Sequence, residues 1–343
     1  MKKVLLVGGG SGGHICPLLP LQREFSRKNI TCELLVSSSA LDRQIIRGNF
    51  PSTQTYFLAT DKIRRYWSIK NLLAPFKICR SIFAAFLLLK KICPDVVFLK
   101  GGFVCFPVLM ATVLCNAVSS KKIIIFSHES DFSPGFVTRL AQKFARKHFS
   151  NFGSPSCPLF YSTAKFSRKK SKFLLPRLLI MGGSQGSKNI NTLFAKNFKS
   201  LCDNYLVTLV TGEKNPQTVK HKNLQIYPSL PAKKLSLLIA NSQAIISRAG
   251  ANSLLEIIYY SVPSLILPLS SAARNHQTEN AKFFAKKNLC QIYSPEGRKN
   301  LLLCLRSIQN SKTIQKALKN YKLTNSAPEI ALEIIKHLEI KPT

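Results

Sequence analysis

The sequence predicts an α/β protein made of two doubly wound, Rossmann-like domains, each with a parallel sheet covered by helices on both faces. Two glycine-rich turns carry this prediction, because residues 8–14 and residues 182–186 each follow a short apolar run and open a helical stretch. Elsewhere, apolar runs of strand length alternate with longer helical patterns, which is typical of parallel sheets. With 343 residues and 45% hydrophobic content, the chain is long enough for two domains.

The predicted strands fall into two sets. The first comprises residues 4–7, 33–36, 96–99 and 123–126, and the second comprises residues 178–181, 206–211, 244–247 and 264–267. Between the sets, residues 151–176 are rich in Ser, Pro and Lys. We therefore predict an N-terminal domain at 1–157, a linker at 158–176 and a C-terminal domain at 177–343, and leave open whether the terminal helix returns to the first domain. A ligand is expected in the cleft between two such domains.

The glycine turns suit phosphate, because a strand that passes through glycines into a helix presents free N–H groups and the positive end of the helix dipole. Gly8, Gly10 and Gly13 fit the dinucleotide pattern G-x-G-x-x-G. However, the second predicted strand ends in three serines and lacks the acid that would hold a ribose. Glycines at such turns also serve chain geometry alone. A nicotinamide or flavin oxidoreductase stays open as an alternative.

The net charge of the chain favours an anionic partner. The chain has 50 Lys and Arg against 15 Asp and Glu, a net charge of +35, which favours nucleotide sugars, acidic lipid headgroups or nucleic acid. A general lysine bias would give the same number. The ten cysteines form no C-x-x-C motif and no zinc-like cluster with histidine, so we expect reduced thiols in a cytosolic protein, with no metal.

Three segments bear on membranes and secretion. Four apolar residues before the first glycines are too few for a signal peptide. Residues 101–118 carry no charge but contain two glycines and Pro107, and we interpret them as a loop and a buried helix. Residues 64–91 mix basic and apolar side chains around the only tryptophan, Trp67, a composition that predicts membrane contact. The alternative is ordinary core residues with a basic rim.

Several segments of the chain form an ordered set of motifs: residues 8–14, 100–103, 128–131 with 134–135, 182–186, 247–256, and 276–281. Together these segments resemble the MurG family of peptidoglycan glycosyltransferases. The resemblance spans about residues 1–290. It implies a GT-B fold with two sheets facing a central cleft, and inverting transfer of N-acetylglucosamine from UDP-N-acetylglucosamine to lipid I, giving lipid II, without a cofactor or essential metal. It also implies peripheral attachment to an anionic membrane surface, at the cytoplasmic face of the plasma membrane, and no nucleic-acid partner.

The resemblance also assigns the site. An inverting transfer needs a base for the acceptor hydroxyl and groups that hold the charge developing on the leaving diphosphate. The implied catalytic residues are His14, which can lie beside either the attacking hydroxyl or the diphosphate, and Glu129 on the acceptor side. Ser184 would hold the diphosphate, Glu256 the ribose hydroxyls and Gln277 the sugar hydroxyls. The remaining implied substrate-binding positions are Ser11, Gly12, Gly13, Asp131, Leu230 (in the segment that caps the uracil), Ala251, Asn252, Ser253, Leu254 and Leu255.

The chain departs from the family pattern at three places. Ser11 stands where the family usually carries Thr, Ser130 and Asp131 stand where it carries Gln and Asn, and Cys157 stands where it carries a donor-site Arg. Alternatives to the lipid I transferase are a related GT-B enzyme acting on a diacylglycerol lipid, the oxidoreductase above, and a non-catalytic basic binding protein.

Overall fold

The structure is a computed structural model that describes residues 2–60, 74–152, 155–162, 175–212, 219–268, 276–297 and 300–339. The chain forms two compact units. The first comprises Met1–Ser130, Pro134–Phe160 and Asn325–Thr343, and the second comprises Asp131–Ser133 and Tyr161–Thr324. Most of the predicted linker, including the basic run at 168–170, lies outside the described residues.

The first unit contains a six-stranded parallel sheet in the order β3-β2-β1-β4-β5-β6. Its strands are β1 (Lys3–Val7), β2 (Thr31–Ser37), β3 (Thr55–Leu58), β4 (Val96–Leu99), β5 (Ile124–Glu129) and β6 (Lys147–Ser150). Its helices are α1 (Gly12–Ile15), α2 (Leu18–Arg27), α3 (Ala40–Asn49), α4 (Ala74–Ile92), α5 (Cys105–Val118), α6 (Phe136–Phe144) and α13 (Ala327–Glu339).

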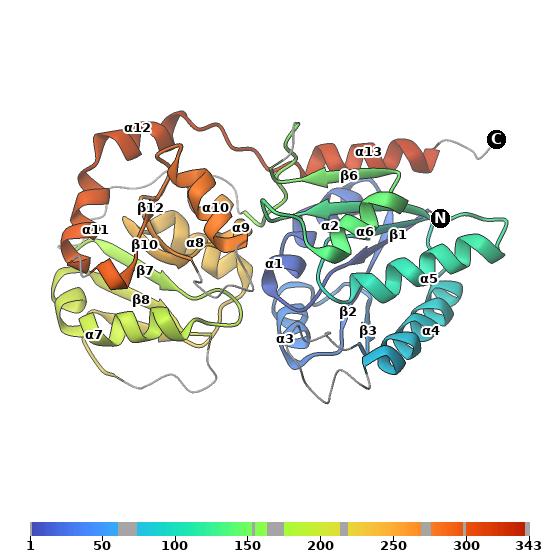
Figure 1. The fold of residues 1–343 in the computed structure, drawn as a ribbon, viewed down its shortest axis with the longest axis horizontal. Coiled ribbons are helices and arrows are strands. Elements are labelled where there is room, and N and C mark those ends of the chain that lie inside the picture. Colours follow the sequence, from blue (N-terminus) through green and yellow to red (C-terminus); the bar gives the residue numbers. More distant parts are fainter. Residues whose placement is uncertain are drawn as a thin grey trace. The chain divides into compact units, whose positions relative to one another are not determined.

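Helices cover both faces of this sheet. The inner strands are buried almost without interruption, as expected for a parallel sheet covered on two sides. On one face, α4 and α5 pack side by side over a core that includes Leu5, Val97 and Leu109 (Figure 1). Elsewhere in the unit, the C-terminal helix α13 packs on α2, and its Glu333 forms an ion pair with Lys147 of β6 at 3.1 Å.

The second unit repeats this plan, with a parallel sheet in the order β12-β11-β10-β7-β8-β9. Its strands are β7 (Arg177–Met181), β8 (Leu206–Val210), β9 (Leu224–Tyr227), β10 (Ala244–Arg248), β11 (Ser264–Leu267) and β12 (Gln291–Ile292). Its helices are α7 (Lys188–Asn204), α8 (Ala232–Asn241), α9 (Ala251–Tyr259), α10 (His276–Ala285), the 3₁₀ turn η2 (Pro295–Gly297), α11 (Leu301–Asn310) and α12 (Lys312–Asn320). One core cluster joins α7 and α11 to the sheet.

The predicted α/β class and both parallel sheets are confirmed, and all eight predicted strands are present. The four strands that the sequence did not predict, β3, β6, β9 and β12, are the edge strands of the two sheets. Edge strands are buried less completely and carry more polar residues, so they lack the continuous apolar run that marks an inner strand. In addition, β5 extends to Glu129, three residues beyond its predicted end.

The uncharged segment at 101–118 forms a loop followed by α5, and half of the residues of that helix are buried. Among the described residues, no helix is long and apolar enough to cross a membrane.

Candidate functional site

Each glycine turn lies at a point where the order of strands reverses. In the first sheet this point falls between β1 and β4, and in the second between β7 and β10. Ligands of open α/β sheets bind at the carboxyl ends of the strands at such points. The turns at 8–14 and 182–186 follow β1 and β7, so each unit presents one of them at its own switch point.

In the first unit, two turns meet closely around His14. Gly101 and Gly102 follow β4 with φ of +107° and +88°. A Cβ on Gly102 would overlap the Gly9 carbonyl, and one on Gly101 would lie 3.1 Å from His14 Nδ1. Only glycine allows this approach, because it combines positive φ with the absence of a side chain. The half-buried imidazole of His14 is therefore held against the strand-end turn of β4.

Asp42, which the sequence analysis did not single out, fills part of the first turn. Its fully buried carboxylate accepts hydrogen bonds from Gly10 N at 2.9 Å and from Ser37 Oγ at 2.5 Å. The expectation that this turn suits phosphate is therefore wrong at Gly10, because a carboxylate already occupies that N–H group and would repel a phosphate. The spacing Ser39-x-x-Asp42 predicts a helix start, but the contact with Gly10 spans 32 residues.

Glu129 lies at the end of β5 in a buried polar cluster. Its two carboxylate oxygens accept hydrogen bonds from Ser130 N at 2.7 Å and Gly135 N at 3.2 Å. Next to it, the Lys100 ammonium donates to Ser130 Oγ, although that lysine is only 1% exposed. Burial, together with the charge of Lys100, lowers the pKa of His128 well below its usual value.

The other predicted positions of the first unit are Ser11, Gly12 and Gly13. Ser11 is half-buried and stands at the N-cap of α1 without a side-chain capping bond, and Gly12 and Gly13 form the first residues of that helix. Cys157, which stands where the family has Arg, accepts a hydrogen bond through its carbonyl from the His128 ring at 3.0 Å. Gly153 and Ser154 lie outside the described residues.

In the second unit, the turn at 182–186 also depends on a close approach of two main-chain segments at glycines. Gly186 and Gly212 have φ of +71° and +74°, and a Cβ on Gly212 would overlap the Gly186 backbone. Ser187 then caps α7 by accepting from Ile190 N. Ser184, the residue expected to hold the diphosphate, lies exposed within the turn.

Arg248, at the end of β10, links the two strands that flank this switch point. Its guanidinium donates to the Gly186 carbonyl at 3.2 Å and to Gln277 Oε1 at 3.4 Å. The sequence resemblance included Arg248 in a motif but gave it no role. These contacts bring together three segments of the sequence resemblance, residues 182–186, 247–256 and 276–281. Gln277 of α10 lies beside the end of β10.

Glu256 lies on α9, the helix that follows β10, and Gly250 is the N-cap residue of this helix. Its side chain is half-buried, and no hydrogen bond or ion pair joins its carboxyl to any other described residue. Burial without a partner raises the pKa of Glu256 to about 8. Of the neighbouring predicted positions, Ala251, Asn252, Leu254 and Leu255 are buried and Ser253 is half-buried.

Asp131 and Leu230 complete the predicted set. Asp131 groups with the second unit, where its Oδ1 accepts from Asn280 Nδ2 at 2.9 Å. Asn280 is fully buried and also bonds the Ala249 carbonyl at 3.2 Å. Leu230 is half-buried between β9 and α8. Among the residues that the structure describes, no three His, Cys, Asp or Glu side chains are close enough to share a metal ion.

Two doubly wound domains with glycine turns at both switch points define the class as a GT-B glycosyltransferase fold, and the comparisons agree. The model of the glycosyltransferase family 28 N-terminal domain matches residues 4–150, and that of the family's C-terminal domain matches residues 177–334. The chain belongs to glycosyltransferase family 28.

The chain is also similar to named relatives and to a solved structure. A Legionella pneumophila UDP-N-acetylglucosamine–N-acetylmuramyl-(pentapeptide) pyrophosphoryl-undecaprenol N-acetylglucosamine transferase is 32% identical over 95% of this chain and 94% of its own. The Staphylococcus carnosus protein of the same name is 29% identical over 100% and 99%. The crystal structure of Acinetobacter baumannii MurG matches with a TM-score of 0.70 at 22% identity, covering 98% of this chain and 100% of that one.

The raised pKa of Glu256 predicts a pH-dependent stability. In the folded chain, the Glu256 carboxyl keeps its proton up to about pH 8, whereas in the unfolded chain it titrates near 4.5. The contribution of this group to the free energy of unfolding is therefore fully present below pH 4.5, and it is lost as the pH rises from there through 8. Glu256→Gln cannot ionise. We expect it to gain on the order of 1–2 kcal/mol relative to wild type between about pH 5 and pH 8.5, after allowance for partial exposure.

Thermal unfolding followed by circular dichroism at both pH values measures this effect. Glu329→Gln, which removes an exposed carboxyl from α13, is the matched control and should show no such gain. A gain in the Glu256 variant that is equal at the two pH values would contradict the assignment.

Proposed function

We propose that this chain transfers N-acetylglucosamine from UDP-N-acetylglucosamine to undecaprenyl-pyrophosphoryl-N-acetylmuramoyl-pentapeptide, forming lipid II for peptidoglycan. The support is family membership over both domains and full-length similarity to transferases named for these substrates. In the chain itself, the observation that carries the proposal is the carboxyl of Glu256 on α9, the helix after the switch-point strand β10, which has no hydrogen-bond or ion-pair partner among the described residues. The test is product formation by purified protein with lipid I, compared with a diacylglycerol acceptor.

The second unit is proposed to bind the donor. The exposed turn around Ser184 offers its hydroxyl and main-chain N–H groups to the diphosphate. Glu256 accepts hydrogen bonds from the ribose hydroxyls and Gln277 contacts the sugar, while Arg248 fixes the turn through the Gly186 carbonyl. Leu230, the first turn of α9 and Asp131 complete the substrate contacts. No step in this scheme uses a cofactor or metal.

Above the raised pKa of Glu256, where its carboxyl is ionised, Glu256→Ala is expected to weaken UDP binding about ten- to a hundredfold, because a hydrogen bond to a charged partner contributes roughly 1.5–3 kcal/mol. Isothermal titration calorimetry with UDP measures the affinity. Glu329→Ala, remote in sequence and exposed on α13, serves as the control. An unchanged affinity in the Glu256 variant would remove this residue from the donor site.

The first unit is proposed to serve the acceptor. The His14 imidazole, held by the turn of Gly101 and Gly102, takes the proton from the attacking acceptor hydroxyl. Glu129 acts on the acceptor side, where its carboxylate fixes the main chain of Ser130 and Gly135. Ser11, Gly12 and Gly13 form the adjoining helix start.

His14→Ala is expected to lower turnover about 10²–10⁴-fold while UDP affinity stays unchanged, which is the signature of lost proton transfer. A parallel loss of UDP affinity would make His14 a binding residue instead. Glu129→Ala, by contrast, should depress turnover mainly at limiting lipid I. Steady-state kinetics with both substrates varied separates the two effects, and an unaltered acceptor dependence would rule out the role of Glu129.

Peripheral membrane attachment is also proposed, through the surface of α4 and α5. Five large apolar side chains are exposed there, from 47% to 73%: Phe76, Phe83, Leu87, Leu114 and Val118. Basic residues border them, including Arg80, Lys90 and Lys91. Of the predicted stretch, Ile82 and Phe86 pack against the core, and residues 61–73, with Trp67, lie outside the described residues. An apolar patch with a basic rim is typical of an interfacial surface.

Replacing Arg80, Lys90 and Lys91 together by Gln should weaken binding to vesicles that contain phosphatidylglycerol on the order of 100-fold, since each cation near such a surface contributes about 1 kcal/mol. Co-sedimentation measures the binding, and added salt should weaken it further. The control removes three exposed lysines of α12, Lys312, Lys316 and Lys319, and matches the change in charge. Equal losses in both variants would indicate unspecific attraction.

A further inference from the structure

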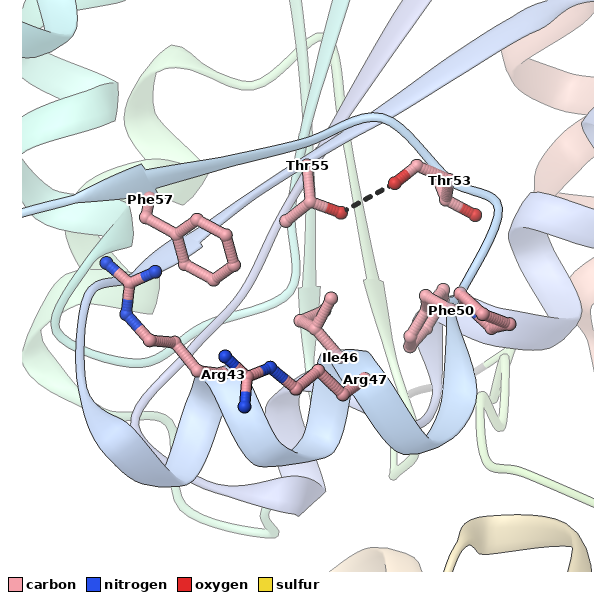
Figure 2. Close-up of a pocket in the computed structure, with 8 residues that line it drawn as sticks. Arg43, Ile46, Arg47, Phe50, Thr53, Thr55 and Phe57 are labelled. Atoms are coloured by element: carbon pink, nitrogen blue, oxygen red, sulfur yellow. Dashed lines mark hydrogen bonds between the residues drawn. The ribbon is translucent and has the colours of Figure 1, made fainter.

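A recess lies in the first unit, between α3 and the edge strand β3. Residues of α3, of the loop after it and of β3 line a solvent-open cavity of about 420 Å³ (Figure 2). The strand β3 is the outermost strand of its sheet, and β2 and β1 separate it from the switch point between β1 and β4. The recess is thus distinct from the glycine turns, and none of the predicted site residues lines it.

Two arginines dominate its charge. Arg43 and Arg47 stand four residues apart on α3 and extend along the same side of the helix (Figure 2). The Arg43 guanidinium lies 4.2 Å from the centre of the Phe57 ring, and its Nε donates to the Ser38 carbonyl at 3.3 Å. Arg47 has no hydrogen-bond or ion-pair partner among the described residues. No acidic side chain lines the recess, so two like charges face it uncompensated.

The remaining lining suits a small organic phosphate. Ile46 and Phe50 are buried beneath it and supply an apolar floor. Thr53 Oγ1 accepts from Gln22 Nε2 at 3.3 Å, which leaves its own proton available to a ligand. The Thr55 hydroxyl donates to the Thr53 carbonyl at 2.9 Å and so holds this rim in place (Figure 2). Guanidinium groups and a hydroxyl donor around an apolar floor match a phosphate group attached to an apolar or planar moiety.

We propose that this recess binds the phosphate group of a second ligand, independently of the donor and acceptor sites. Phe57 and Ser38 hold the Arg43 side chain in place before a ligand binds, so it loses little conformational freedom on binding. Arg47 provides a second guanidinium group for the phosphate oxygens. Two sources carry this chemistry, a soluble phosphorylated molecule and the headgroup of an anionic lipid.

Arginine labelling with phenylglyoxal, mapped by peptide mass spectrometry, tests the site on the full chain. Inorganic phosphate should protect Arg43 and Arg47 saturably, compared with chloride at equal ionic strength. Arg306, which is exposed in the second unit and bonded to Asn204 at 2.9 Å, should not be protected. Equal protection of all three arginines, or of none, would overturn the proposal.

A variant tests whether the two arginines share one ligand. In Arg47→Gln, the phosphate concentration that protects Arg43 should rise about tenfold, because one charge-assisted contact is lost. Arg27→Gln removes the same charge from α2, where Arg27 pairs with Glu24 at 2.7 Å, and should leave the protection of Arg43 unchanged. Unchanged protection in Arg47→Gln would refute a shared site.

Vesicles then distinguish the two sources of phosphate. If phosphatidylglycerol vesicles protect Arg43 and Arg47 while phosphatidylcholine vesicles do not, the ligand is a lipid headgroup. If vesicles protect Arg80 of α4 alone and inorganic phosphate protects Arg43 and Arg47, the ligand is soluble. Both results support the site, and protection by neither probe overturns it.

Discussion

The close approach of main chain to main chain at the strand ends is the constraint on which the candidate site depends. Gly102 meets the Gly9 carbonyl in the first unit, and Gly212 meets the backbone of Gly186 in the second. A side chain at either position would force the turns apart, and positive φ would add backbone strain. Since His14 and Ser184 are carried by these turns, glycine at the contacts sets where they stand.

Three acids of this strongly basic chain differ in the hydrogen-bond donors that surround their carboxyl groups. Buried Asp42 is satisfied by Gly10 N and Ser37 Oγ, and buried Glu129 by the N–H groups of Ser130 and Gly135. Glu256 has no such partner in the described chain, and its pKa is raised to about 8. A half-buried carboxylate without hydrogen-bond donors is less favourable than one to which a ligand supplies them. The first two acids therefore hold the main chain in place, whereas the proposed role of the third is to accept hydrogen bonds from ligand hydroxyl groups.

Sequence reasoning predicted the inner strands because both of their faces are buried, which leaves an apolar run that is readable without neighbours. It missed β3, β6, β9 and β12 because an edge strand pairs on one side only and keeps polar residues. It also ended β5 before His128 and Glu129, whose polar side chains conceal that they still pair with β6. The roles assigned to His14, Glu129 and Glu256 came from ordered motifs and stay predictions.

The sequence by itself determined the α/β class, the two sheets, the glycine turns and the family, because each depends on local periodicity or on motifs read in order. Tertiary structure alone decided that Asp42 occupies the N–H of Gly10, that Arg248 joins the Gly186 turn to Gln277, and that Arg43 and Arg47 share a recess with Phe57. The Asp42, Arg248 and Phe57 contacts join residues brought together by the pairing of strands or the packing of helices. Local patterns cannot specify such contacts, because chain folding sets them across tens of residues.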